Sequence, residues 1–433
     1  MHHVVIGAGP AGVVAAEHLR KYDTGCGVTL VGAEDEPPYS RMAIPYYLVR
    51  QIEENGTHLR KTPGHFDRLG IEVRRARVTG IDTAKRTCML DGGGSIGYDR
   101  LLIATGASPV TPPIPGTDLE GVHNCWNLSD ARRIIEYCKP GRRIVLIGAG
   151  FIGCIILEAL VASRAEVRVV EMENRMVPRM MNETAGGMIR RWSERKGVEV
   201  FTSTRVASID KKGDALSVAL RPAGKGERAG DAGRAIDADL VITATGVASN
   251  IGFATDSGID ADQGLLVNEY LQTSSENIYA AGDCAQGRDF STGGYSVQAI
   301  QPTAVEHGRI AARNMCRGHE IRHAGNVNMN VLATMGLISS SFGLWMGVDG
   351  GDSAELVDPS EFRYLNLQFE DDILVGASSL GLTEHVGVIR GLIQTRTRLG
   401  GWKEKLKSNP TRLMEAYIAS TQPLEHNAGV TGV

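Results

Sequence analysis

The chain opens on an apolar run that leads directly into a glycine-rich turn, His3-Val-Val-Ile-Gly-Ala-Gly-Pro-Ala-Gly12. Residues 13–20 have the composition of a helix, and a second apolar run, 28–31, ends just before Glu34. This order of strand, G-x-G-x-x-G turn, helix, strand and acid is typical of a βαβ unit that binds a dinucleotide. The glycines permit a tight turn, a close approach of the backbone to a pyrophosphate and tight helix packing. The free N–H groups at the helix N-terminus then face the phosphates, and Glu34 accepts hydrogen bonds from a ribose.

The same pattern recurs about 140 residues later. An apolar run, 143–147, leads into Gly148-Ala-Gly-Phe-Ile-Gly153, and the next apolar run ends at Glu171. The sequence therefore predicts an α/β protein with two Rossmann-like dinucleotide-binding units. A carboxylate at Glu171 repels a 2′-phosphate, so the second site is predicted to prefer NADH to NADPH, although Arg175 nearby weakens that preference.

Composition argues against a nucleic-acid-binding protein, a membrane-spanning protein and a metal-binding protein. The 433 residues carry a net charge of −4 with a pI of about 6.3, which predicts no broad basic surface for nucleic acid. No apolar run is long enough to cross a bilayer. No two of the seven cysteines form a C-x-x-C pair, so the sequence predicts no metal site and reduced thiols in a cytoplasmic protein.

Three later segments complete an ordered set of motifs. They are Tyr98-Asp-Arg-Leu-Leu-Ile-Ala-Thr-Gly106, Ala238-Asp-Leu-Val-Ile-Thr-Ala-Thr-Gly246 and Asn277-Ile-Tyr-Ala-Ala-Gly-Asp283. With the two turns, this set resembles the FAD- and NAD(P)H-dependent pyridine nucleotide-disulphide oxidoreductases, in the branch of the ferredoxin reductases, NADH oxidases and nitrite reductase flavoproteins. The resemblance implies that NADH reduces a bound FAD.

The resemblance also implies a domain plan and a set of site residues. An FAD domain of residues 1–110 and 247–324 would be interrupted by an NAD(H) domain of residues 111–246. A C-terminal α+β domain, 325–433, would serve as an interface or for dimerisation. The predicted FAD-binding residues are Gly7, Gly9, Pro10, Ala11, Gly12, Glu34, Arg41, Ala104, Thr105, Gly106, Gly282, Asp283 and Thr303. The predicted NAD-binding residues are Gly148, Gly150, Phe151, Ile152, Gly153, Glu171 and Gly246.

The segment Glu36-Pro-Pro-Tyr-Ser-Arg-Met-Ala-Ile-Pro-Tyr-Tyr-Leu48 departs from part of this family. In the related coenzyme A-disulphide reductases a redox cysteine stands where this chain has Met42. A thioether forms neither a mixed disulfide nor a sulfenic acid, so thiol-based chemistry is not expected. Tyr46 takes the place where ferredoxin reductases often have a lysine near the flavin. It is a candidate flavin-lining residue, with core packing as the alternative.

Two helices carry further expectations. A helix beginning near Thr303 would point its positive dipole end at the flavin, with a simple cap as the alternative role of that side chain. After the second turn, Ile155 stands where many relatives have a glutamate that approaches the nicotinamide. Glu158 matches a second, structural glutamate. The loss at Ile155 leaves open whether NADH binding is retained.

Together these features predict an FAD-dependent NADH oxidoreductase that passes electrons to an external acceptor. The expected acceptor is an iron–sulfur carrier of the ferredoxin or rubredoxin kind, or an iron–sulfur partner subunit, and the chain is expected to be a homodimer or a complex subunit. The alternatives are an NADH oxidase or quinone reductase, an FAD-binding scaffold subunit, and a thiol-disulfide reductase, which Met42 disfavours.

Two surface segments complete the expectations. Residues 223–233 are predicted to form a polar surface loop. The C-terminal part is locally basic, which suggests either a solvated helix face or a docking patch for an acidic carrier. Its basic residues are Arg390, Arg396, Arg398, Lys403, Lys405, Lys407 and Arg412.

Overall fold

The first sheet brings together strands from distant parts of the chain. In the computed structural model, which describes residues 1–224 and 233–422, five parallel strands pair in the order β19-β7-β1-β2-β3. The strands are β1 (His2–Ile6), β2 (Gly27–Gly32), β3 (Ile71–Arg75), β7 (Arg100–Ile103) and β19 (Ile278–Ala280). Val4, Leu30 and Leu102 are fully buried, as expected where helices and loops cover both faces of a parallel sheet.

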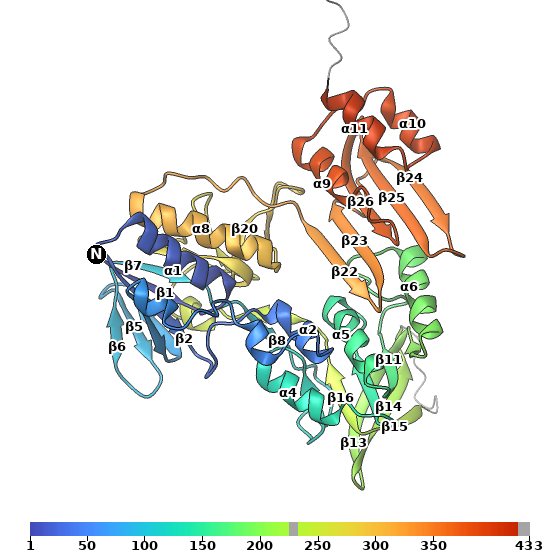
Figure 1. Cartoon of the computed structure of the whole chain (residues 1–433), viewed down its shortest axis with the longest axis horizontal. Helices are drawn as coiled ribbons and strands as arrows, with labels where there is room; N and C mark the ends of the chain where they lie inside the picture. Colours follow the sequence, from blue (N-terminus) through green and yellow to red (C-terminus); the bar gives the residue numbers. More distant parts are fainter. Residues whose placement is uncertain (225–232, 423–433) are drawn as a thin grey trace, which may run out of the picture.

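Two long helices lie side by side against this sheet (Figure 1). They are α1 (Pro10–Tyr22) and α8 (Gln301–Arg317). Glycine permits their close approach, because a Cβ on Gly308 would lie 2.4 Å from the carbonyl oxygen of Ala11. Helix α8 begins two residues before the predicted start at Thr303, since a proline in the first turn gives up no intrahelical hydrogen bond.

Shorter elements surround the first sheet. Two three-stranded sheets, β4-β5-β6 and β18-β20-β21, accompany it, and small helices occupy the loops. These elements are β4 (Val78–Asp82), β5 (Thr87–Leu90), β6 (Ser95–Gly97), η1 (Arg41–Ala43), α2 (Ile44–Leu48), η2 (Glu54–Thr57), α3 (His65–Arg68), α7 (Gly252–Thr255), β18 (Leu265–Leu266), η3 (Gly282–Cys284), β20 (Ala285–Arg288) and β21 (Tyr295–Val297).

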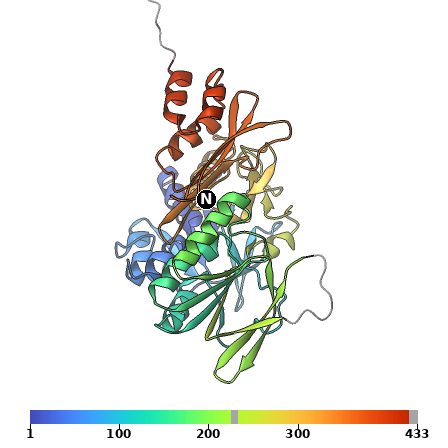
Figure 2. The same cartoon turned by 90° about the vertical axis from the view of Figure 1, so that its right-hand side faces the viewer.

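The second sheet repeats the parallel design, with strand order β12-β11-β10-β16-β9. Its strands are β9 (Val122–Asn124), β10 (Arg143–Ile147), β11 (Glu166–Val170), β12 (Glu199–Phe201) and β16 (Leu240–Thr243). The helices of this part are α4 (Leu128–Tyr137), α5 (Phe151–Ala162) and α6 (Glu183–Arg195). Strands β13 (Thr204–Lys212), β14 (Ala215–Pro222) and β15 (Arg234–Ala238) form an antiparallel sheet, whose hairpin projects from the body in Figure 2. Residues 225–232 of the predicted 223–233 loop lie outside the described part of the chain.

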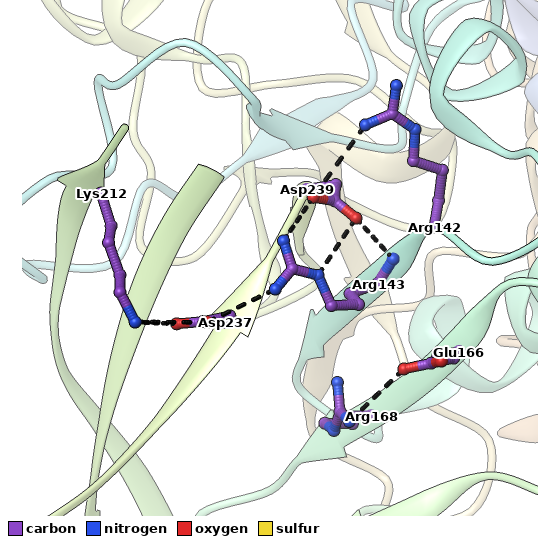
Figure 3. Close-up of polar contacts among 7 residues, drawn as sticks. All are labelled: Arg142, Arg143, Glu166, Arg168, Lys212, Asp237 and Asp239. Atoms are coloured by element: carbon purple, nitrogen blue, oxygen red, sulfur yellow. Dashed lines mark hydrogen bonds and ion pairs between the residues drawn. The ribbon is translucent and has the colours of Figure 1, made fainter. Parts of the chain in front are cut away.

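A charge network joins this antiparallel sheet to the amino-terminal end of the parallel one (Figure 3). Arg143 donates from its backbone N–H and its guanidinium to the Asp239 carboxylate, the shortest contact being 2.7 Å. Asp237 accepts from Arg143 at 3.4 Å and from Lys212 at 3.0 Å. The side chain of Asp239 is only 13% exposed, so its pairing is poorly screened by water. The network therefore ties β10, β15, β16 and β13 together.

We expect Asp239→Asn to lower the free energy of unfolding by about 2 kcal/mol, because it removes charge-assisted hydrogen bonds from a partly buried site. Hydrogen bonds from Arg143 hold the pKa of Asp239 below its usual range. The wild type should therefore have its full excess in unfolding free energy over the variant above about pH 4, the pKa of a free aspartate. This excess should disappear as the pH falls through the lowered pKa of Asp239. Urea unfolding at pH 7 and at pH 3 measures this. An equal deficit of the variant at both pH values would contradict it.

A two-stranded antiparallel ribbon carries the chain between the two parallel sheets. It pairs β8 (Ala107–Pro109) with β17 (Val247–Ser249). The predicted domain boundaries at 110 and 247 fall beside it.

The third sheet is antiparallel, with strand order β22-β23-β26-β25-β24. Its strands are β22 (Met329–Thr334), β23 (Leu337–Gly343), β24 (Asp352–Asp358), β25 (Arg363–Glu370) and β26 (Ile373–Leu380). Helices α9 (Val386–Thr395), α10 (Trp402–Ser408) and α11 (Leu413–Thr421) share a hydrophobic core with this sheet. Helix α9 ends at Thr395 because the next residue, Arg396, adopts the left-handed conformation with φ 49°. Residues 423–433 of the predicted C-terminal domain lie outside the described part.

The third sheet rests on the second unit. Edge strand β22 packs on α5, and Leu332, Leu337 and Tyr364 belong to the same buried cluster as residues of the second parallel sheet. The Trp192 indole N–H donates to the carbonyl oxygen of Thr334 at 3.1 Å, and Asn182 donates to the Tyr364 hydroxyl at 2.6 Å. Two parallel sheets and this antiparallel one confirm the predicted fold class. In the described part of the chain, no helix is both long and apolar enough to cross a membrane.

Candidate functional site

One cavity of about 1760 Å³ runs between the carboxyl ends of the two parallel sheets. Ligands of open α/β sheets bind outside this end of the strands. The predicted site residues that line the cavity are Gly7, Gly9, Pro10, Ala11, Glu34, Arg41, Ala104, Thr105, Gly106, Gly282 and Asp283 from the first unit, and Gly148, Gly150, Phe151, Ile152, Glu171 and Gly246 from the second. The tertiary structure thus brings most of the predicted site residues to one continuous space.

The three glycines of the first turn have different surroundings. Gly7 has φ +112°, and a Cβ on it would lie 2.1 Å from the Ala104 carbonyl oxygen. A Cβ on Gly12 would lie 1.8 Å from the Gly7 carbonyl oxygen, so Gly12 permits α1 to pack on the turn. A Cβ on Gly9 would have no protein atom within 4 Å. The missing side chains of Gly7 and Gly12 therefore permit close packing within the protein, whereas the missing side chain of Gly9 leaves space for a ligand.

The second turn shows the same division. Gly148 has φ +99°, and Cβ atoms on Gly148 and Gly153 would lie 2.5 Å and 2.2 Å from backbone carbonyl oxygens. A Cβ on Gly150 would have nothing within 4 Å. Helices α1 and α5 begin at these turns without a side-chain cap or an acidic residue in the first turn. Their first N–H groups are therefore suited to bind anions.

Glu34 and Arg41 form one polar wall of the cavity. Glu34 accepts from the Tyr39 hydroxyl at 2.6 Å and pairs with Arg41 at 2.8 Å. Arg41 also donates to the Ala107 carbonyl oxygen at 3.0 Å, and its guanidinium lies 5.1 Å from the centre of the Trp126 ring. The carboxylate and the guanidinium are each at least one-third exposed, so both remain accessible to a ligand.

Asp283 also lines the cavity and lies beside the start of α8. Burial raises the pKa of Asp283, and the Arg41 guanidinium opposes that shift. Gly282 adopts φ +75°, and a Cβ there would meet the Cβ atoms of Ala11 and Ala304 at 3.3 Å. The turn before Asp283 thus fits between α1 and α8.

Two predicted flavin-lining residues lie outside the cavity lining. Thr303 is 1% exposed and its hydroxyl has no hydrogen-bond partner among the described residues, whereas the neighbouring Gln301 and Ala304 do line the cavity. Tyr46 is 55% exposed. Helix α2 turns Ile44 and Leu48 inward, so the side chain between them points away from the core.

The wall beside the second turn is apolar. Ile155 and Ile156 of α5 line it together with Met180. Glu158 is exposed on the far side of the helix and does not reach the cavity. Glu171 is buried, and its carboxylate accepts from the backbone N–H groups of Ala149 at 2.6 Å and Glu173 at 2.9 Å. Glu171 therefore stabilises the turn itself, a role that the sequence pattern did not predict.

Trp126 and Cys125 were missed because they follow a short strand that carries no motif. Both line the cavity, and the Trp126 indole donates to the same Ala107 carbonyl oxygen as Arg41, at 2.9 Å. Only the pairing of distant segments places them there, so no local signal could have identified them.

The family of pyridine nucleotide-disulphide oxidoreductases matches residues 1–308, a stretch that contains both glycine turns and the Asn277–Asp283 motif. The chain belongs to this family. The prediction of an oxidoreductase that uses FAD and a nicotinamide dinucleotide is thereby confirmed.

Two relatives and one solved structure show which kinds of protein this flavoprotein is similar to. The chain is 30% identical to the NADH-dependent phenylglyoxylate dehydrogenase subunit epsilon of Aromatoleum evansii, over 97% of each chain. It is 27% identical to the rubredoxin-NAD(+) reductase of Pseudomonas putida, over 72% of this chain and 79% of the relative. The solved structure of a NAD-dependent persulfide reductase from A. fulgidus is 29% identical, with a TM-score of 0.83, and the match covers 93% of this chain and 78% of that one.

Burial raises the pKa of all seven cysteines, which disfavours their nucleophilic thiolate form. All seven are free, and Cys125 is the one that lines the cavity. Burial raises the pKa of Cys125 and of Cys154 to about 12, and that of Cys138 to about 11. Met42, whose thioether has no ionisable proton, also lines the cavity.

Proposed function

We propose that this flavoprotein oxidises NADH and delivers the electrons through FAD to an iron–sulfur carrier protein or partner subunit. The observation that supports the proposal most strongly is the single cavity shared by the two glycine turns. Two dinucleotides bound at these turns would share one space. Their reacting rings are then positioned by the protein, and no catalytic acid or base is required.

The described residues fit FAD at the first turn. The open space at Gly9 and the uncapped start of α1 accommodate a pyrophosphate, and Arg41 supplies a nearby cation. When bound, FAD takes a hydride from NADH and passes its electrons on to an acceptor. Helix α8 presents its N-terminus, which has no acidic residue in the first turn, through Gln301 and Ala304. Its dipole favours negative charge in the cavity.

The second turn fits NADH. Gly150 leaves the same open space as Gly9, and the apolar surfaces of Ile155 and Met180 offer a dry wall for a nicotinamide. Arg175 does not line the cavity, because its guanidinium donates to the carbonyl oxygens of Met181 and Pro178. Arg175 therefore does not offset the repulsion between the Glu171 carboxylate and a 2′-phosphate. NADH is the proposed donor in preference to NADPH. Initial rates with the two coenzymes measure this preference directly.

The acceptor is proposed from the relatives. The rubredoxin reductase indicates a small iron–sulfur protein, and the full-length match to a dehydrogenase subunit indicates a partner within a larger complex. We propose that the chain works as such a subunit or as a homodimer.

The basic C-terminal segment is a weak candidate for the docking surface. Arg398 pairs with Asp372 at 2.7 Å, Lys403 and Lys407 both pair with Asp352, and Arg412 pairs with Glu415 at 3.3 Å. Four of the seven basic residues predicted for docking are thus paired with acidic residues of the C-terminal unit itself.

Anaerobic rapid mixing tests the proposal. NADH should bleach the yellow colour promptly, and oxidised rubredoxin or a ferredoxin should then restore it faster than oxygen or a quinone does. A flavin that stays yellow after NADH would refute the enzyme and support a scaffold role. Faster recovery with oxygen or a quinone would assign a small-molecule reductase instead.

The rival thiol mechanism makes a different prediction for alkylation. Thiols with a pKa of about 11 are thiolate to only about 3 parts in 10,000 at pH 7.5, and thiolate is the reactive form. We therefore expect native protein to take up less than one iodoacetamide per chain within an hour and to keep full activity. Mass spectrometry counts the adducts, and denatured protein, which should take up seven, is the control. Rapid labelling of Cys125 with loss of activity would instead support thiol chemistry.

A further inference from the structure

Three potential metal ligands meet at the amino-terminal edge of the first sheet. His3 lies in β1, Asp23 caps the C-terminus of α1, and Cys26 immediately precedes β2. One ligand atom from each of the three lies within 4.8 Å of the other two. The glycine turn and the cofactor cavity lie at the opposite, carboxyl end of the same strands, so this cluster is separate from the proposed redox site.

His3 is the unexplained member of the cluster. Its side chain is completely buried, and neither ring nitrogen has a hydrogen-bond partner among the described residues. Burying a polar group without a partner costs free energy, and buried polar atoms are almost always paired. A ligand that bonds to the imidazole would remove this penalty.

Cys26 and Asp23 supply the other two potential metal-donor atoms near His3. Cys26 is 4% exposed, and its thiol contacts the Asp23 carbonyl oxygen at 3.0 Å. The Asp23 carboxylate is half-buried, and one of its oxygens accepts from the Gly25 N–H at 3.0 Å. A carboxylate oxygen, a sulfur and an imidazole nitrogen thus converge from three adjacent positions of one βαβ unit.

We propose that His3, Asp23 and Cys26 bind one zinc ion. Imidazole nitrogen, thiolate sulfur and carboxylate oxygen are the donors that zinc takes in proteins. Tetrahedral zinc holds such donors roughly 3.3–3.6 Å apart, so the three ligand atoms, which lie within 4.8 Å of one another, would move closer together on binding. Binding would release the Cys26 thiol proton to solvent, so affinity should rise with pH.

The sequence predicted no metal site because the spacing is unusual. Asp23 and Cys26 form a D-x-x-C pair, and the third ligand precedes it by 20 residues across an entire helix. Only the parallel pairing of β1 with β2, which sets His3 opposite Val28, brings the ligands together.

The fourth coordination position would be filled by water, or by Cys316 if its side chain moved closer, because its sulfur is not among the ligand atoms that lie within 4.8 Å of one another. The Cys316 thiol contacts the Leu19 carbonyl oxygen at 3.9 Å, and the same oxygen accepts from the Asp23 N–H at 2.9 Å. Cys316 therefore lies at the same helix end as the cluster. The ion would join β1, α1 and β2 at the edge remote from the dinucleotide turn. Because zinc is not redox-active, its role would be structural.

Metal binding by the full-length, FAD-loaded protein tests this proposal. After chelation and dialysis, Zn²⁺ is titrated against a competing chromophoric chelator, and Co²⁺ is added separately as a spectroscopic probe. We expect one Zn²⁺ per chain, and a thiolate-to-cobalt charge-transfer band at high energy. Asp23→Asn and Cys26→Ser should each weaken Zn²⁺ binding at least tenfold and abolish the rise in unfolding temperature that Zn²⁺ produces in the wild type.

Two further cysteine variants serve as a control and as a test of the fourth ligand. Cys138→Ser, at a half-buried thiol in another part of the molecule, should bind Zn²⁺ as the wild type does. Cys316→Ser should weaken binding only if its sulfur, rather than water, fills the fourth position. Flavin content reports correct folding, and Asp23→Asn decides the matter if Cys26→Ser misfolds. Absence of stoichiometric Zn²⁺, or wild-type affinity in Asp23→Asn, would overturn the proposal.

Discussion

A Gly9→Ala protein should fold normally and purify without its yellow colour. A Cβ at this position meets no protein atom within 4 Å, so the substitution introduces no clash in the protein itself. The methyl group would instead occupy the space where the turn opens into the cavity and where a pyrophosphate would approach the backbone. We expect the dissociation constant for FAD to rise on the order of 100-fold, about 2.8 kcal/mol. Titration of the apoprotein with FAD, followed by flavin fluorescence, measures this.

Two other alanine substitutions serve as controls for Gly9→Ala. Gly187→Ala, in the middle of α6 and near only the tip of a flexible arginine side chain, should keep both colour and stability. Gly12→Ala should lose colour together with stability, because its Cβ would lie 1.8 Å from a backbone oxygen. Wild-type FAD affinity in Gly9→Ala would show that the first turn does not hold the flavin dinucleotide.

Gly150→Ala should give the complementary result, a yellow protein that NADH no longer bleaches at ordinary concentrations. Gly150 has the same open surroundings as Gly9, but at the turn of the second sheet. The added methyl group should raise the apparent dissociation constant for NADH on the order of 100-fold while FAD stays bound. The dependence of the anaerobic bleaching rate on NADH concentration measures it.

Dithionite provides the control for Gly150→Ala, since it reduces flavins without using a nucleotide site. The variant should be bleached by dithionite as the wild type is, and its flavin content should be unchanged. Half-saturation by NADH at the wild-type concentration would contradict the assignment. Together, Gly9→Ala and Gly150→Ala separate the two sites, because each variant should lose one dinucleotide and keep the other.

The local sequence predicted the structure correctly where backbone sterics decide it, as at the two glycine turns. The positive φ angles at Gly7 and Gly148 and the close contacts of Gly12 and Gly153 follow from the G-x-G-x-x-G spacing alone.

Side-chain surroundings were less predictable. Tyr46 was a candidate flavin-lining residue, with core packing as the alternative, yet the helical turn of α2 directs its side chain to the surface. The basic C-terminal residues suggested a docking patch, and acidic residues from β24 and the β25–β26 turn neutralise much of their charge. For the basic residues, the deciding partners come from segments that the local pattern does not include.

The order of motifs by itself determined the two dinucleotide turns, the α/β class and the family, because each depends on which residues tolerate a given backbone conformation within a short stretch. Only the tertiary structure decided that both turns open into one cavity, that Trp126 and Cys125 line it, and that His3 meets Asp23 and Cys26 at the far edge of the sheet. These features depend on contacts between residues far apart in sequence, and such contacts exist only after the strands have paired and the helices have packed.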